Sequence, residues 1–96
     1  HNLADNITKD TVTEAINKGK YYAVFPYLDT LAKHNLFTKD HVTQLLNKGN
    51  YKDVFSNLDT LKKHGLADAV TKDTVTRAIN EGNYKDVFNN LYTLLK

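Results

Sequence analysis

Histidines are the residues of this 96-residue chain best suited to metal chemistry, and His1, His34 and His64 occupy equivalent places in a repeated pattern. Neutral imidazole is the commonest metal ligand in proteins. Equivalent residues of stacked helical repeats lie on the order of 10 Å apart, the distance at which helices pack, whereas zinc–nitrogen bonds are about 2 Å long. Three such imidazoles cannot share one ion, so we predict no metal site.

An ordinary structural role accounts for these histidines. His34 and His64 each stand at the end of a segment with a helical pattern, and His1 is at the equivalent position. A basic side chain near a helix C-terminus complements the helix dipole. The fourth histidine, His41, stands where the other copies of the pattern have Thr11 and Thr74. We expect His41 to be a solvent-facing residue in the first turn of a helix.

Catalytic motifs are missing from the sequence. It contains no Gly-x-Ser-x-Gly, no His-Glu-x-x-His and no glycine-rich phosphate loop. The carboxylates are scattered over polar faces, and Gly19, Gly49 and Gly82 each stand where a helix must end. We therefore predict that the chain is not an enzyme and has no catalytic residue and no cofactor.

The composition excludes several other classes of function. Thirteen basic side chains are balanced by eleven acidic ones, and Arg77 is the single arginine, so a nucleic-acid partner is not expected. The sequence has no cysteine and no apolar run long enough for a membrane span. Low sulfur with abundant Lys, Asn and Thr is typical of many secreted and cell-surface proteins. Because the sequence does not begin with methionine, we expect a fragment or processed piece of a longer repeat-containing protein that is secreted or lies at the cell surface.

The chain contains three copies of one unit. Residues 8–33, 38–63 and 71–96 align without gaps, and the second and third copies are identical at 18 of 26 positions. The joints between copies differ in length, because residues 66–70 contain three more residues than the corresponding Leu36-Phe37. We predict one domain built of three tandem repeats, residues 1–33, 34–63 and 64–96.

Each repeat is predicted to form two antiparallel helices. A threonine caps the first helix (Thr8, Thr38 or Thr71), apolar residues follow at i, i+3 and i+4, and a glycine ends it. The second helix carries apolar residues at i, i+3, i+4, i+7 and i+10, beginning at Tyr21, Tyr51 and Tyr84. The second helix of the first repeat ends at Asn35 and that of the second at Gly65, each just beyond the repeat's last residue, and Asn2 is the equivalent position. Gly and Asn best tolerate the left-handed conformation. The expected fold is all-α: three αα-hairpins, six helices in all, stacked as a short solenoid or a compact bundle.

The largest difference between the copies lies in the second helix of the first repeat. The polar residues Lys52, Asp53, Ser56 and Asn57 of the second repeat are replaced by Tyr22, Ala23, Pro26 and Tyr27. Tyrosine supplies large contact area and is enriched at binding surfaces. Pro26 lacks the N–H that a continuing helix requires, so we expect a kink or a late helix start near Phe25.

Three interpretations of these aromatic residues remain open. They pack against another helix of the same chain, or they form a partner or self-association surface centred on Tyr22 and Tyr27, or they line a small-molecule pocket. In the third repeat, Tyr92 and Leu95 stand where the second has Asp59 and Lys62. They are packing at the chain's end or part of the same interface.

The sequence therefore predicts a non-catalytic helical-repeat module that binds a protein or peptide partner or a second copy of itself. The predicted contact residues are Tyr22, Pro26, Tyr27 and Tyr92. One alternative is a carrier that encloses an apolar small molecule, a lipid or pigment, between its helices. Another is a structural, storage or self-assembling repeat protein.

Overall fold

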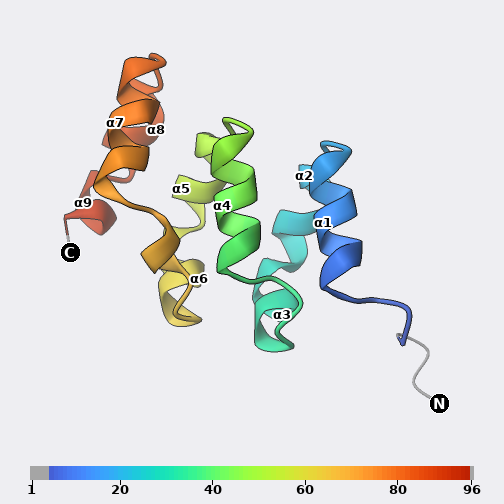
Figure 1. Cartoon of the computed structure of the whole chain (residues 1–96). Coiled ribbons are helices and arrows are strands. Elements are labelled where there is room, and N and C mark those ends of the chain that lie inside the picture. The colour runs from blue at the N-terminus through green and yellow to red at the C-terminus, as the bar shows by residue number, and fades with distance from the viewer. Residues whose placement is uncertain (1–4, 96) are drawn as a thin grey trace.

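The computed structural model describes residues 5–95 and is all-helical over that range, as predicted; no strand occurs among these residues (Figure 1). The predictions for His1, Asn2 and Lys96 concern residues outside this range. In chain order the elements are α1 (Lys9–Asn17), α2 (Tyr21–Val24), the 3₁₀ turn η1 (Phe25–Tyr27), α3 (Leu28–Lys33), α4 (Lys39–Asn47), α5 (Tyr51–Ser56), α6 (Leu58–Lys63), the 3₁₀ turn η2 (Ala67–Ala69), α7 (Lys72–Asn80), α8 (Tyr84–Asn89) and α9 (Leu91–Leu94).

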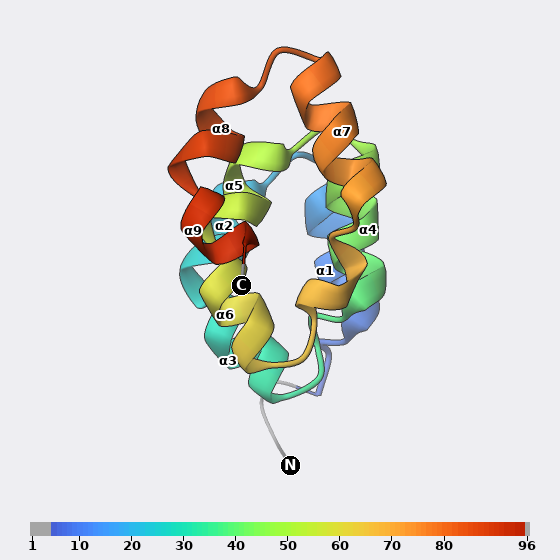
Figure 2. The same ribbon diagram turned by 90° about the vertical axis from the view of Figure 1, so that its left-hand side faces the viewer.

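The helices form two layers. Viewed from the end in Figure 2, α1, α4 and α7 make one layer, and α2–α3, α5–α6 and α8–α9 make the other. Each nine-residue helix pairs with the shorter helices that follow it, and successive pairs stack side by side along the molecule (Figure 1). The described chain is elongated, measuring 47 × 26 × 19 Å. This arrangement is consistent with three tandem hairpins.

Helix caps and tight turns form where the sequence indicates them. The Thr71 hydroxyl accepts a hydrogen bond from the backbone N–H of Thr74, which satisfies a donor that the helix leaves free. Gly49 has a φ of 82°, and its turn is closed by a bond from the N–H of Asn50 to the carbonyl of Leu45. Asn35 also adopts a positive φ, 60°, so the predicted left-handed helix end at this residue is confirmed.

The second helix of each hairpin differs from the prediction, because it is divided into two short segments. The division falls at Asn57, whose φ of −112° and ψ of 18° are not helical. Its side-chain amide donates to the carbonyl of Asp53 at 2.7 Å, and its backbone N–H turns to Val54 instead. A side chain that takes the carbonyl of residue i−4 competes with the helical hydrogen-bond ladder. Asn90 makes the equivalent pair of hydrogen bonds in the third hairpin, from its side-chain amide to Asp86 and from its backbone N–H to Val87.

In the first hairpin the corresponding division contains Pro26. The expected distortion is present there as the 3₁₀ turn η1, in which proline needs no i−4 hydrogen-bond partner. Because the hairpins without proline divide at the equivalent place, Pro26 is accommodated at a break common to all three.

A single apolar core runs along the whole stack between the two layers. Most of its most deeply buried members come from α4 and α5. A fully buried side chain of this size stabilises the fold by about 1.5–3 kcal/mol. The side chains with less than two per cent exposure are Ile16, Phe37, Val42, Leu45, Tyr51, Val54, Phe55 and Leu61. The second hairpin therefore supplies most of the deep core, since it is covered on both sides.

Candidate functional site

The middle hairpin shows which positions face a neighbouring hairpin and which face solvent. Tyr51, Phe55 and Leu58 are at most 3% exposed there, whereas Lys52 and Ser56 are exposed. The hydroxyl of Tyr51 donates at 2.8 Å to Oε2 of Glu81, the residue that follows α7, so this side of α5 faces the third hairpin. Burial and the bond to the Glu81 carboxylate raise the pKa of Tyr51. The positions of Tyr51, Phe55 and Leu58 are thus stacking positions.

The same stacking positions are uncovered in the third hairpin. Tyr84, Phe88 and Leu91 are 53%, 62% and 42% exposed. Leu95, at the position of Lys62, is 78% exposed. We call Tyr84, Phe88, Leu91 and Leu95 the C-terminal end surface. Their exposure follows from position in the stack, because no described residue lies where the next hairpin would.

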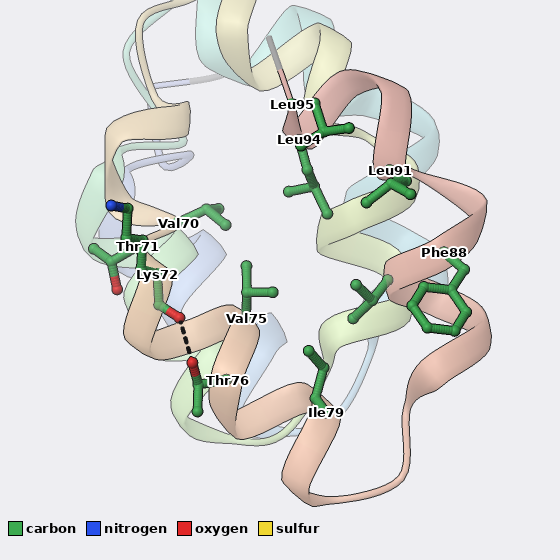
Figure 3. Close-up of a pocket in the computed structure, with 11 residues that line it drawn as sticks. Val70, Thr71, Lys72, Val75, Thr76, Ile79, Phe88, Leu91, Leu94 and Leu95 are labelled. Atoms are coloured by element: carbon green, nitrogen blue, oxygen red, sulfur yellow. Dashed lines mark hydrogen bonds between the residues drawn. The ribbon is translucent and has the colours of Figure 1, made fainter.

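Beside these residues, a groove of about 480 Å³ runs between α7 and α8–α9 (Figure 3). Val75 and Ile79 point into it from α7, and Leu91 and Leu94 face them from α9. Among the described residues that line the groove, Lys72 alone is titratable. The groove can therefore accept an apolar surface but has little with which to perform acid–base chemistry.

The opposite end of the stack has its own uncovered side chains. Tyr27 is 63% exposed, although its equivalents Asn57 and Asn90 are half-buried. Thr30 is likewise exposed where the second and third hairpins have half-buried threonines. Together with three residues at the start of the first hairpin, Tyr27 and Thr30 form what we call the N-terminal end surface: Ile7, Thr11, Ala15, Tyr27 and Thr30.

The four residues singled out from the sequence do not form one surface. Tyr22 and Pro26 are exposed at positions that are also exposed in the middle hairpin, so they face outward. Lys20 Nζ lies 5.9 Å from the ring centroid of Tyr22. Tyr27 lies beside them at the N-terminal end. Tyr92 lies on α9 at the other end of the stack and is 80% exposed (Figure 1). Because Tyr22 and Tyr27 are exposed, the interpretation that they pack against another described helix does not hold.

The expectation for His41 is wrong, because this residue is only 3% exposed. Its Nδ1 accepts from the N–H of Thr38 at 2.9 Å, which leaves the ring proton on Nε2, 3.0 Å from the carbonyl of Lys9 in α1. The ring also stacks on Phe37. His41 is buried because the first hairpin lies against it, and the residues around position 41 do not reveal this contact. One signal was available: His41 and Leu45, one turn apart, are both larger than their counterparts in the other copies.

His64 and Asp29 join the first and second hairpins. His64 Nε2 lies 2.7 Å from Asp29 Oδ1, and Lys63 Nζ lies 3.2 Å from the same oxygen. The hydrogen bonds from His64 and then Lys63 hold the pKa of Asp29 below its ordinary value of 3.8. Within residues 5–95, no three His, Asp or Glu side chains come together in a way that would hold a metal ion.

Asp29→Asn is expected to lower the free energy of unfolding near neutral pH and to have no effect in strong acid. The folded-state pKa of Asp29 is depressed, so its contribution to stability is present above the ordinary pKa of 3.8 and is lost as the pH falls through the folded value. Urea unfolding from pH 2 to 7 measures this dependence. Asp59→Asn, the equivalent change in the second hairpin, is the control; equal losses from both variants at every pH would contradict the prediction.

Comparison with known proteins identifies no relative. No protein-family model, curated protein or solved structure matches the chain significantly. Within the part of the chain that the structure describes, no helix has both the length and the apolar character of a membrane span.

Proposed function

We propose that this chain is a non-catalytic helical-repeat module that binds a protein or peptide partner through its C-terminal end surface. The observation that carries the proposal is the exposure of Tyr84, Phe88 and Leu91, whose equivalents in the second hairpin are covered by another hairpin. Contiguous apolar surface of this kind marks interaction sites, and aromatic side chains are enriched at the centres of interfaces.

The groove favours a helical partner. Its two walls are helical, and most of the side chains that line it are apolar, including Val75 and Ile79 on α7 (Figure 3). An amphipathic helix binds such a groove through apolar residues at i, i+3, i+4 and i+7. General acid–base catalysis needs positioned titratable groups, and Lys72 is the one titratable residue among the described residues that line the groove. The groove is therefore better suited to binding than to catalysis.

The residues predicted from the sequence fit this proposal in different ways. Tyr92 neighbours Leu91 on α9, at the C-terminal end, and Tyr27 belongs to the N-terminal end surface. Tyr22 and Pro26 face outward from the side of the stack, so we propose them as a separate contact.

Peptide selection tests the proposed function. A displayed library of amphipathic helical peptides is selected on the wild-type protein, and the enriched peptides are titrated against Phe88→Lys and Asn89→Lys. Both positions are exposed on α8, but the position of Asn89 is also exposed in the middle hairpin. We expect wild-type affinity for Asn89→Lys and affinity ~tenfold or more weaker for Phe88→Lys, because the lysine places a charge on apolar surface. Equal binding to both variants, or no enriched peptide, would refute the proposal.

A carrier of an apolar small molecule is the second candidate, favoured by the volume of the groove. About 480 Å³ falls within the range of ~300–1,000 Å³ that is usual for small-molecule sites. Native mass spectrometry of protein from its natural source, with a fluorescent fatty acid as a probe for titration, tests this function. A bound lipid or pigment that Phe88→Lys loses would favour the carrier, and a bare mass with no probe binding would count against it.

A further inference from the structure

We propose that the C-terminal end surface of one molecule binds the N-terminal end surface of a second copy, so that copies of this chain join head to tail. This inference rests on the proposed function and names its partner: the first hairpin of another copy. The occupant is inferred from contacts inside the molecule, because each internal junction shows what covers these stacking positions.

The C-terminal end surface has the residues that already bind a hairpin in this molecule. At the junction of the second and third hairpins, Tyr51 and Phe55 of α5 and Leu58 of α6 are buried. The third hairpin has the same residue types at the equivalent positions, in the same order, and the Tyr84 and Phe88 rings stack as their counterparts do. This surface is therefore already suited to an αα-hairpin of this kind.

The first hairpin has the residues that bind to such a surface. At the internal junction, Glu81 at the C-terminal end of α7 contacts Tyr51. Ala78 and Thr74, about one and two turns earlier, are buried. The equivalent residues of α1 are alanine and threonine as well, whereas α4 has Leu45 and His41. At these two positions the first hairpin thus resembles the third, which covers Tyr51, Phe55 and Leu58 of the second.

The joint that precedes α1 supports the same match. Residues 3–7 correspond in length to residues 66–70, while the joint before α4 is three residues shorter. Val70, at the end of the longer joint, packs against the core, and its equivalent Ile7 is 46% exposed. A hairpin lying beside the first would cover Ile7, which the described residues leave half-exposed.

The differences between the internal junction and the proposed one are complementary. Lys62 Nζ donates to the carbonyl of Thr93 across the internal junction at 2.8 Å. The equivalent residues are Leu95 on one copy and Thr30 on the other, and Tyr27 lies one turn before Thr30. A polar contact is thereby replaced by an apolar one through changes on both surfaces. At the position of Glu81 the second copy has Lys18, whose ammonium can donate to the Tyr84 hydroxyl.

Such an interface is heterologous, so it leaves one free end of each type in every assembly. Interfaces of this type extend into open chains unless the rotation closes a ring. Each added copy continues the stacking of hairpins that occurs inside the molecule. We therefore expect the average mass of the wild-type protein to rise steadily with concentration.

Mixing two blocked variants tests the proposal by sedimentation velocity. Phe88→Lys blocks the C-terminal end surface, and Tyr27→Lys blocks the N-terminal one; both side chains are mostly exposed, so both variants should fold. Each variant alone is expected to associate ~tenfold or more weakly than the wild type, and so to be monomeric at concentrations where the wild type associates. An equimolar mixture of the two is expected to form a one-to-one dimer. Asn89→Lys, on the outward face of α8, is the matched control and should associate as the wild type does.

Each outcome decides the question. If the mixture stays monomeric while the wild type associates, the head-to-tail arrangement is overturned. It is also overturned if Tyr27→Lys dimerises alone, because that result indicates a symmetric contact between C-terminal end surfaces. A wild-type protein that is monomeric at millimolar concentration would also overturn it. If selected peptides still bind at Phe88 in that case, the proposed function stands and only the second copy as partner is excluded.

Discussion

Phe55→Ala is expected to lower the free energy of unfolding by about 3–5 kcal/mol, which is the usual cost of emptying a fully buried phenylalanine site. The equivalent change in the third hairpin, Phe88→Ala, should cost less than about 1 kcal/mol, because exposed positions contribute little. The two residues have the same type and the same place in their hairpins, yet one is 0% exposed and the other 62%.

Urea denaturation followed by circular dichroism measures both values. It should be done at low protein concentration, because association would add to the apparent stability of the wild type. Equal losses from the two variants would show that Phe88 is covered in solution, and would contradict its assignment to the C-terminal end surface.

His41→Ala is expected to lower the free energy of unfolding by about 2–3 kcal/mol. The change leaves the N–H of Thr38 without its acceptor and removes the bond to the carbonyl of Lys9, and an unsatisfied buried group costs about 1–3 kcal/mol. The stacking contact with Phe37 is lost as well.

His41→Thr separates these contributions. The N–H of Thr8 donates to the hydroxyl of Thr11 at 3.0 Å in the first hairpin, so a threonine at position 41 can keep the cap while losing the bond to the neighbouring hairpin. We expect a loss of about 1–2 kcal/mol, between the wild type and His41→Ala. Equal stability of His41→Thr and the wild type would show that the junction does not depend on this residue.

The features that could be predicted from the sequence are those decided within one hairpin. Thr71 caps a helix because its hydroxyl lies within reach of an N–H three residues on. Gly49 ends one because the left-handed conformation costs glycine little. The division at Asn57 could not be predicted from periodicity, since the apolar stripe continues through it. It depends on whether one amide takes the carbonyl of Asp53, which the pattern does not reveal.

Features decided between hairpins were harder to predict. His41 resembles a surface residue until the preceding hairpin is in place. Tyr27 and Tyr92 were noticed because they depart from the other copies. Phe88 and Leu91 were not, because they agree with the repeat and therefore resembled core residues. Their exposure comes from the end of the described stack, so comparison of the copies alone could not identify them.

The aligned divisions in the second helices have a mechanical consequence. Tyr27, Asn57 and Asn90 interrupt the α2–α3, α5–α6 and α8–α9 layer at the same height in every hairpin, while α1, α4 and α7 run unbroken. Rotation about a residue outside the helical ladder disrupts fewer backbone hydrogen bonds than bending a continuous helix. One face of the molecule is therefore stiff and the other has a line of hinges, and a bending force will be absorbed along that line.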